Sequence, residues 1–167
     1  MILLEPVDKM INTDALQKIR SIADYQFGRG VGAKFFSDDV RIFYSRNTGK
    51  IRHIHLRDEL LATLQPTTGL FILTVAGAKR MMREVDPPHL WVKVEDDAES
   101  FVSRGRSVFA KHVFEVDTEI RPNEEVIVVN RKNEVLAIGR ALLSGMEMIA
   151  FKRGVAVRVR HGVSEKS

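Results

Sequence analysis

Hydrophobic residues in the first forty positions recur at helical spacing. Apolar side chains three or four residues apart predict an amphipathic helix over residues 13–27: Leu16, Ile19, Ile22 and Ala23. Asn12 or Thr13 is expected to cap its start, because a side-chain oxygen there can accept a hydrogen bond from a free amide of the first turn. Gly28 and Gly30 are expected to end it, since glycine readily takes the left-handed conformation of a C-terminal cap.

A short second helix is expected around residues 32–36, and the period of the pattern then changes to two. Between residues 40 and 75 we predict a four-strand antiparallel meander from the segments VRIFYS, IRHIHLR, LLATLQP and LFILTV. Asn47 and Gly49 are expected to supply the positive φ angles of the first hairpin turn. The segment AGAKRMMREV predicts a closing helix, which ends at DPPH because proline has no N–H and restricts the residue before it.

The second half of the chain reads mostly as short strands. These are LWVKV, SVFAKHVFEV, EEVIVVN, VLAIGRALL and GVAVRVR, with DDAESFVSR as a short helix. Short strands at this spacing predict a small closed barrel, which leaves no unpaired edge. We therefore predict an α+β protein with a helix-and-sheet domain over residues 1–86, a β-barrel domain over residues 87–162 and a disordered tail over residues 163–167.

The composition narrows the classes of function. The absence of cysteine excludes disulfides, thiolate zinc sites and cysteine nucleophiles. No signal peptide and no apolar run of the roughly 20 residues that span a bilayer can be seen, so a cytoplasmic protein without a membrane partner is expected. Lys plus Arg number 26 against 22 Asp plus Glu, and this net charge of +4 favours a polyanionic partner such as nucleic acid. The same charge is also within the range that keeps a small domain soluble.

The spacing Gly28-x-Gly30-x-x-Ala33 fits the glycine pattern of dinucleotide-binding loops. In that fold the glycines follow a strand, open a helix and belong to a βαβ unit. Here they follow a predicted helix and precede antiparallel hairpins. We therefore expect these glycines to cap and turn the chain, and no cofactor is expected.

Longer segments carry a resemblance to a known family. The segments ADYQFGRG, YSRNTGKIRHIHL and ELLATLQPTTGLFILTVAGAKRM resemble the small domain that precedes the PUA domain in archaeal tRNA-guanine (archaeosine) transglycosylase; archaeosine synthase has a similar C-terminal region. The segments VSRGRSVFAKHV, EEVIVVNRKNEVLAIGRALLS and MIAFKRGVAVRVRHG resemble the PUA domain itself. The resemblance covers residues 14–162. It implies a pre-PUA domain followed by a PUA pseudo-barrel that holds the acceptor stem and 3′ end of tRNA.

The resemblance implies binding rather than catalysis. The catalytic domain of the transglycosylase is a TIM barrel of roughly 200 residues or more, for which this sequence has no room. We therefore expect a non-catalytic, stand-alone RNA-binding module that presents tRNA to a separately encoded modifying enzyme in archaeosine biosynthesis. Two alternatives stay open: a translation factor of pre-PUA and PUA architecture bound to the small ribosomal subunit and tRNA, and a small tRNA-modifying enzyme or subunit.

The resemblance also implies where RNA binds. In PUA domains a helix–strand junction and the last strand form the groove, where cations contact phosphates. The corresponding residues here are Arg104, Gly105, Arg106, Ser107, Lys111, Arg140, Lys152, Arg153, Gly154 and Arg158. Gly105 is expected to let the RNA backbone approach, because it has no side chain. The alternatives are a solvated turn that Gly105 only caps, and ordinary solvent-facing positions for Arg158 and Arg160 on a half-buried strand.

A second basic set lies in the first domain and is a candidate secondary RNA surface: Arg29, Lys34, Arg46, Lys50 and Arg52. Its alternative role is to blunt an exposed sheet edge with charge.

Other candidate chemistry is weaker. His53 and His55 share a strand face, but no third ligand stands at a useful spacing, so no metal site is expected. Adjacent carboxylates such as Asp38 and Asp39 flank turns, and no catalytic constellation is found. Trp91 is expected in a core or domain interface rather than against RNA.

Overall fold

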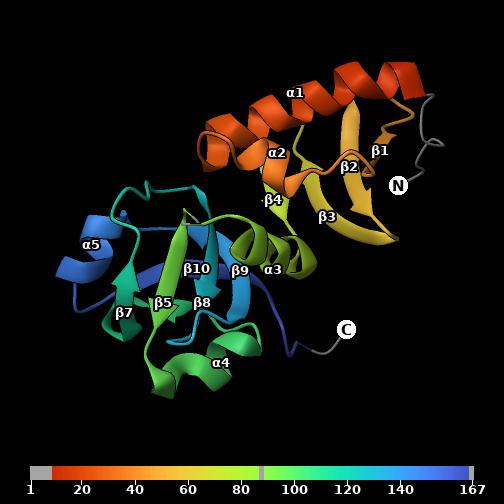
Figure 1. Ribbon diagram of the computed structural model, residues 1–167. Helices are drawn as coiled ribbons and strands as arrows, with labels where there is room; N and C mark the ends of the chain where they lie inside the picture. The colour runs from red at the N-terminus through yellow and green to blue at the C-terminus, as the bar shows by residue number, and fades with distance from the viewer. Residues whose placement is uncertain (1–8, 87–88, 166–167) are drawn as a thin grey trace. The chain divides into compact units, whose positions relative to one another are not determined.

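The computed structural model describes residues 9–86 and 89–165 (Figure 1). The chain separates into two compact units, Met1–Asp86 and Pro87–Ser167, which we call unit 1 and unit 2. Both combine helices with antiparallel strand pairs, which confirms the predicted α+β class.

Unit 1 opens with two helices, α1 (Lys9–Phe27) and α2 (Val31–Phe35). Asn12 and Thr13 lie inside α1, so the prediction that they cap its start was wrong. The predicted end is confirmed: Gly28 and Gly30 have φ angles of 125° and 82°, and the Gly28 amide donates to the Asp24 carbonyl at 3.0 Å.

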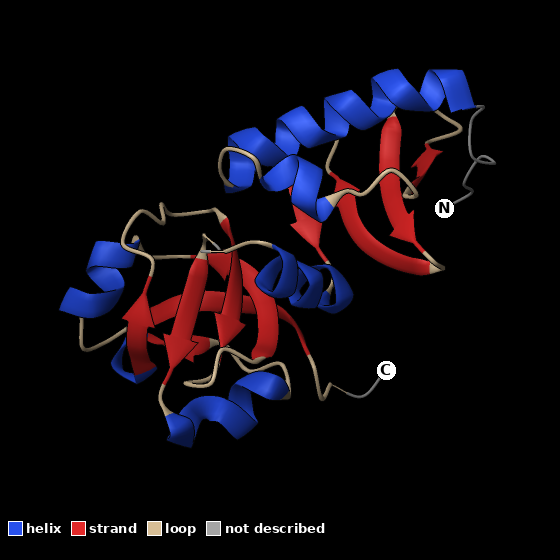
Figure 2. Ribbon diagram, in the orientation of Figure 1, coloured by secondary structure: helices blue, strands red, loops and turns tan. Residues whose placement is uncertain are grey.

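The sheet of unit 1 is the predicted meander (Figure 2). Its strands pair in the order β1-β2-β3-β4, all antiparallel: β1 (Arg41–Tyr44), β2 (Ile51–Leu56), β3 (Glu59–Leu64) and β4 (Phe71–Leu73). Of the two residues predicted to turn the first hairpin with positive φ, only Gly49 does so, with φ of 69°. The β2–β3 hairpin turns through Arg57 and Asp58, whose φ angles are 50° and 71°.

The core of unit 1 forms where α1 and α2 pack on this sheet. Phe35 and Phe36 are fully buried with ring centroids 4.5 Å apart, and Phe36 lies 5.3 Å from Phe71. Gln26 near the end of α1 ties the helix to β4, because its side chain accepts from the Phe71 amide at 2.7 Å and donates to the Phe71 carbonyl at 2.8 Å. Aromatic burial and one paired amide thus fix the helical layer on the β4 edge.

Helix α3 (Val75–Glu84) closes unit 1 by direct approach to the β3 backbone. Thr74 caps the helix, accepting from the Gly77 amide at 3.0 Å. A Cβ atom at Gly77 would lie 2.0 Å from the Leu61 carbonyl oxygen, so only glycine permits this packing.

Unit 2 contains one six-stranded sheet in the order β6-β10-β9-β8-β5-β7. Its strands are β5 (Trp91–Val94), β6 (Val108–Phe109), β7 (Val113–Val116), β8 (Glu125–Val129), β9 (Val135–Ala141) and β10 (Val155–Gly162). The β5–β8 pair is parallel and the others are antiparallel. All five residues of β8 are buried, so this strand is the centre of the core.

The helical segments of unit 2 are η1 (Asp96–Ala98), α4 (Glu99–Ser103), η2 (Ala110–His112) and α5 (Gly145–Ala150). Two of these segments, η2 and α5, were not predicted. The segment SVFAKHVFEV, predicted as one strand, is β6, η2 and β7, because the chain makes a 3₁₀ turn between two different neighbours in the sheet. Helix α5 was not predicted, although Ser144 and Glu147 form a capping box at its start.

The first residues of the predicted disordered tail are held by backbone contacts. The Ser164 amide donates to the Ser103 carbonyl at 2.8 Å, and the Val163 amide donates to the Leu136 carbonyl at 2.9 Å. The prediction of disorder therefore does not fit residues 163–165, while residues 166–167 lie outside the described part of the chain.

Candidate nucleic-acid interface

The two segments assigned to the RNA groove lie side by side in unit 2. Strand β6 pairs with β10 so that Phe109 faces Val155 and Val108 faces Val157. The Ala110 amide donates to the Gly154 carbonyl at 2.9 Å. The junction after α4 and the turn before β10 are thus one continuous surface.

Two arginines face each other on this surface. In the β9–β10 ladder Arg140 is directly opposite Arg158, and both side chains are exposed. Directly opposed residues of an antiparallel pair point to the same face, where like charges destabilise the sheet. A bound polyanion would remove that repulsion.

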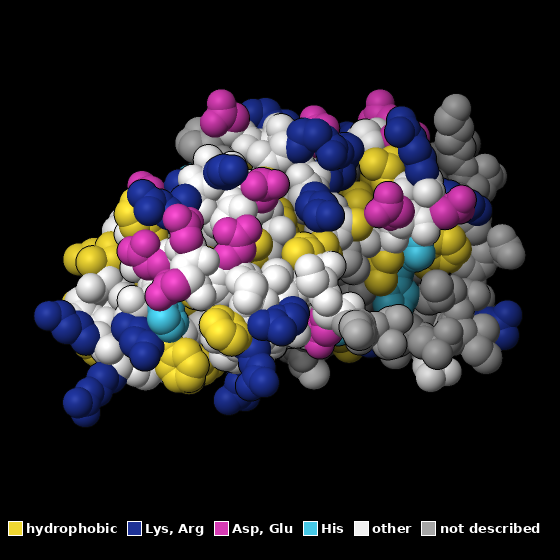
Figure 3. All heavy atoms as spheres, turned by 90° about the horizontal axis from the view of Figure 1, so that it is seen from below, with side chains coloured by type: hydrophobic (Ala, Val, Ile, Leu, Met, Phe, Trp, Pro, Cys, Tyr) yellow, Lys and Arg dark blue, Asp and Glu magenta, His cyan; other side chains and the backbone are white. Residues whose placement is uncertain are grey.

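Four more exposed cations flank this pair. Lys111 follows β6, Lys152 and Arg153 precede β10, and Arg106 lies before β6, beside the residues that follow Val157. We call the whole set the basic strip: Arg106, Lys111, Arg140, Lys152, Arg153 and Arg158. Within the described chain none of these side chains forms a hydrogen bond or an ion pair. The left part of Figure 3, which is unit 2, shows Lys and Arg side chains projecting beside surface hydrophobic groups.

Arg104 does not join the basic strip. Its Nε donates to the Ser100 carbonyl at 3.1 Å, and its guanidinium carbon lies 5.5 Å from the centroid of the Phe101 ring. The side chain therefore closes its own helix α4 and is less available to a ligand.

The predicted approach of RNA at Gly105 meets an occupied position. Gly105 has a φ of 99°, and a Cβ built there would lie 3.1 Å from the carboxylate of Glu165. Glu165 in turn accepts from the Gly162 amide at 3.1 Å. The missing side chain makes room for the protein's own carboxylate.

The two remaining candidate residues of the groove differ in exposure. Gly154 has a φ of 94° with open space around it, and Ser107 is half-buried.

Arg160 on β10 has a structural partner. Its guanidinium forms a two-point contact with the buried carboxylate of Glu125 on β8, with Nη1 2.9 Å from Oε1. Arg160 therefore neutralises a buried acid. It is not the ordinary solvent-facing residue that the sequence pattern allowed, and its guanidinium is not free for RNA.

Sequence reasoning missed aromatic side chains on the same surface. Phe109, on the edge strand β6, is 47% exposed, and Phe151 after α5 is 45% exposed. Aromatic faces beside cations suit unstacked RNA bases. Val108, Phe109 and Ala110 are all apolar, so no alternation of polar and apolar residues in the sequence marks Phe109 as outward-facing.

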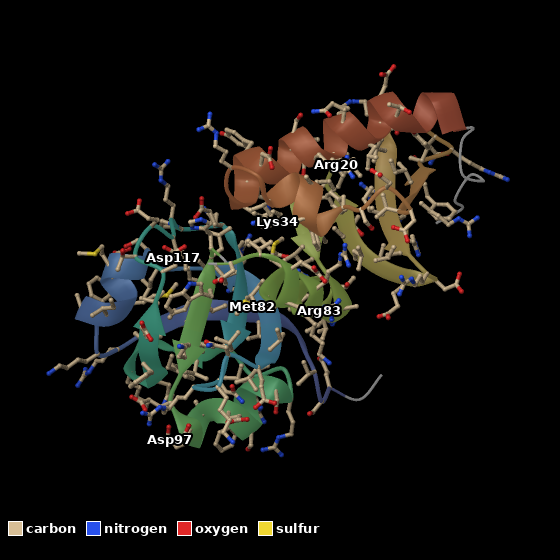
Figure 4. The ribbon with its side chains drawn as sticks, viewed as in Figure 1. Arg20, Lys34, Met82, Arg83, Asp97 and Asp117 are labelled. Atoms are coloured by element: carbon tan, nitrogen blue, oxygen red, sulfur yellow. The ribbon has the colours of Figure 1, made fainter. Side chains whose placement is uncertain are left out.

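The second basic set is not gathered into one cluster. Arg46 and Lys50 lie in the turn after β1, at one edge of the sheet, whereas Arg29 follows the end of α1 that is tied to β4, at the other edge. Lys34 is exposed on α2 (Figure 4). Arg52 on β2 donates to the Leu64 carbonyl at 3.3 Å.

The two histidines of β2 contact a hydroxyl group and an aromatic ring. His53 Nδ1 lies 3.0 Å from Thr63 Oγ1, and the His55 ring packs edge-on against Phe43. Burial lowers the pKa of both imidazoles, helped by Arg52 for His53 and by Arg41 for His55. The described residues contain no group of three ligating side chains that could hold a metal ion.

Within the described chain we also find no helix with the length and apolar character needed to cross a membrane.

Comparison with known families decides what the two units are. The family described as patch-forming domain C2 of tRNA-guanine transglycosylase matches residues 17–88, and the PUA domain family matches residues 91–163. The chain joins a transglycosylase C2 domain to a PUA domain. Unit 1 thus contains the C2 domain and unit 2 the PUA domain, as the resemblance implied.

Longer proteins that contain regions similar to this chain are named as enzymes. The chain is 48% identical over 149 residues to a tRNA-guanine(15) transglycosylase of Methanothermobacter thermautotrophicus, which covers 89% of the chain and 23% of the relative. It is 43% identical over 159 residues to the tRNA-guanine(15) transglycosylase of Thermococcus kodakarensis, covering 95% of the chain and 27% of that protein. The chain thus spans about a quarter of the length of these relatives.

Solved structures share the fold of both domains. A hypothetical protein of Pyrococcus horikoshii is similar with a TM-score of 0.76 and 25% identity, over 99% of this chain and 96% of that one. A conserved PUA domain protein of Thermoplasma acidophilum is similar in fold with a TM-score of 0.66 and 18% identity, over 97% and 95% of the two chains.

Proposed function

We propose that the chain binds tRNA through the basic strip of its PUA domain, at the acceptor stem and 3′ end. In this proposal it holds the tRNA for a modifying enzyme of archaeosine biosynthesis, whose catalytic site lies in another domain or chain. The observation that carries the proposal is the facing pair Arg140 and Arg158, whose charges no acidic side chain of the described chain neutralises.

The chemistry of the basic strip favours RNA among polyanions. Its cations contact phosphates and supply affinity that depends on salt. The exposed rings of Phe109 and Phe151 offer stacking surfaces to bases at an unpaired end. A structured RNA with a single-stranded terminus, as in tRNA, combines both kinds of group.

The test is the affinity of the chain for tRNA with and without its 3′ CCA end, measured by fluorescence anisotropy across a salt series. Tight binding that weakens when the end is removed would support the proposal. Equal binding to both forms would place the site away from the 3′ end, and absence of binding to either form would overturn tRNA binding by this chain.

A pair of variants locates the site. Arg106→Gln with Lys111→Gln removes two predicted phosphate contacts, so the slope of log affinity against log salt should flatten by about 1.5. Lys132→Gln is the control, because Lys132 is exposed in the β8–β9 turn, at the opposite end of β9 from Arg140. An unchanged slope in the double variant would show that the basic strip is not the RNA site.

A further inference from the structure

The C2 domain contains an open cavity of about 420 Å³ that the basic strip does not involve. Its walls come from the loop before β1, the β2–β3 turn and helix α3. The charged residues that line it are Asp39, Arg57, Glu59, Lys79, Arg80 and Arg83. The cavity therefore offers four cations and two carboxylates.

An unusual turn holds Arg57 at this cavity. Arg57 and Asp58 connect β2 to β3 with φ angles of 50° and 71°, the pattern of a two-residue type I′ turn. Asn, Asp and Gly are preferred at the positive φ angles of such turns, so Arg57 is the unusual residue here. Strained residues of this kind gather at ligand sites, where the surrounding structure fixes them.

The four cations differ in how free they are. Arg80 is mostly buried and donates from Nε to the Phe35 carbonyl at 2.7 Å. Arg83, in the last turn of α3, has its Nε 3.2 Å from the Glu84 carboxylate (Figure 4). Arg57 and Lys79 are exposed, and the described residues give neither side chain a hydrogen bond or an ion pair. Two cations are thus available to a ligand.

The carboxylates restrict what that ligand can be. Asp39 accepts from the Ser37 hydroxyl at 2.5 Å, and this bond, together with the backbone amide and the nearby arginines, holds its pKa below the usual value. Asp39 is therefore charged and would repel a purely anionic ligand, as would Glu59. A ligand that carries both a phosphate and a hydroxyl donor suits the two kinds of group together.

We infer that this cavity binds one ribose-phosphate unit of an RNA backbone. The phosphate lies against Arg57 and Lys79, and the ribose 2′-hydroxyl donates to Asp39 or Glu59. A carboxylate that accepts from the 2′-hydroxyl favours RNA over DNA, because deoxyribose lacks that donor. The inference rests on the proposed function for the class of ligand, but on different residues in a different domain.

The test follows the amide resonances of Arg57, Ala76 and Lys79 by NMR in the full chain while the ribodinucleotide UpU or its 2′-deoxy counterpart is added. UpU should shift these resonances, and the deoxy form should bind several-fold more weakly. Lys79→Gln should weaken UpU binding about threefold. Lys18→Gln, the same charge change on the exposed face of α1, should bind like the wild type.

The outcomes separate this inference from the proposed function. Absence of shifts at the cavity, or equal binding by Lys79→Gln and the wild type, overturns the inference even if tRNA still binds the PUA domain. Equal affinity for the deoxy form overturns the assignment to RNA. Shifts at the cavity that are lost in Lys79→Gln, in a chain that does not bind tRNA, would support the cavity and refute the proposed function.

Inorganic phosphate is the other ligand whose negative charge could bind to Arg57 and Lys79. Inorganic phosphate added at the UpU concentrations should shift the resonances less, because it lacks the ribose donor. A larger response to inorganic phosphate than to UpU would overturn the assignment to an RNA backbone.

Discussion

Arg140 on β9 lies directly opposite Arg158 on β10. On its other side Arg140 lies opposite Glu125 of β8, but the Glu125 carboxylate forms its ion pair with Arg160. Two exposed positive charges are thus adjacent in a sheet whose nearby acid is already neutralised. This pair of like charges favours a bound polyanion. Removing one of the two charges should therefore stabilise the fold but weaken binding of the polyanion.

The first prediction concerns Arg158→Gln. Removing one of two like charges across a strand pair should raise the free energy of unfolding by about 0.5 kcal/mol at low salt, and by less at high salt. The same change should weaken tRNA binding and flatten its salt dependence. Urea denaturation at two salt concentrations and anisotropy with tRNA measure both. A variant that is less stable than the wild type at low salt would contradict the like-charge argument.

The second prediction concerns the ion pair between Arg160 and Glu125. Arg160→Gln leaves a buried carboxylate without its cation, which should cost about 3 kcal/mol in the free energy of unfolding. Replacing both residues by leucine should recover much of that loss, because no buried charge remains unpaired. Urea denaturation compares the single and double variants, and a single variant as stable as the wild type would show that the pair is not needed.

The third prediction concerns Gly77 in α3. Helix propensity alone predicts that Gly77→Ala stabilises the helix by about 1 kcal/mol. The added Cβ would lie 2.0 Å from the Leu61 carbonyl oxygen, so we expect a net loss of about 2 kcal/mol instead. Thermal unfolding decides between the two signs. Ala76→Gly in the same turn of helix isolates the propensity contribution.

The fourth prediction concerns pH. Burial holds the pKa of His53 and His55 in the folded C2 domain below the usual 6.5, so the unfolded chain binds more protons below that value. Their contribution to stability is fully present above pH 6.5 and is lost as pH falls towards the folded pKa. The free energy of unfolding should therefore decrease between about pH 7.5 and about pH 5.

The matching variant removes both imidazoles. His53→Gln with His55→Gln should show a smaller decrease over the same pH range. Asp39 titrates below its usual 3.8, so it does not affect this range. A decrease of equal size in the double variant would assign the pH dependence to other groups.

Local patterns predicted most of the fold, and failures arose where tertiary contacts decide. The meander of the C2 domain was predictable because alternation and short turns act between neighbours in the sequence. The single strand predicted across SVFAKHVFEV was wrong, because its two halves pair with β10 and with β5 at different places in the sheet. Helix α5 has six residues, too few for a periodic pattern of apolar residues. Its capping box, Ser144 and Glu147, was the one indication of a helix start in the sequence.

The candidate site was predicted in part. The charges of the basic strip were visible in the sequence, and the pairing of β10 with β6 and β9 decides which of them are neighbours. The occupied space at Gly105 was not predictable, since Glu165 lies sixty residues further on and reaches it only in the folded sheet. The pairing of Arg160 with Glu125 likewise depends on two strands separated by β9.

The position of β10 in the sheet also sets the order in which the two domains can mature during synthesis. The C2 sheet joins strands that follow one another along the chain, so its pairing can be completed soon after residue 73 is made. The basic strip needs β10, the last strand in sequence, to pair with both β6 and β9. A nascent chain that has not yet reached β10 can therefore pair the strands of the C2 sheet but cannot assemble the basic strip. If the basic strip binds tRNA as proposed, only chains that have been translated through β10 can capture it.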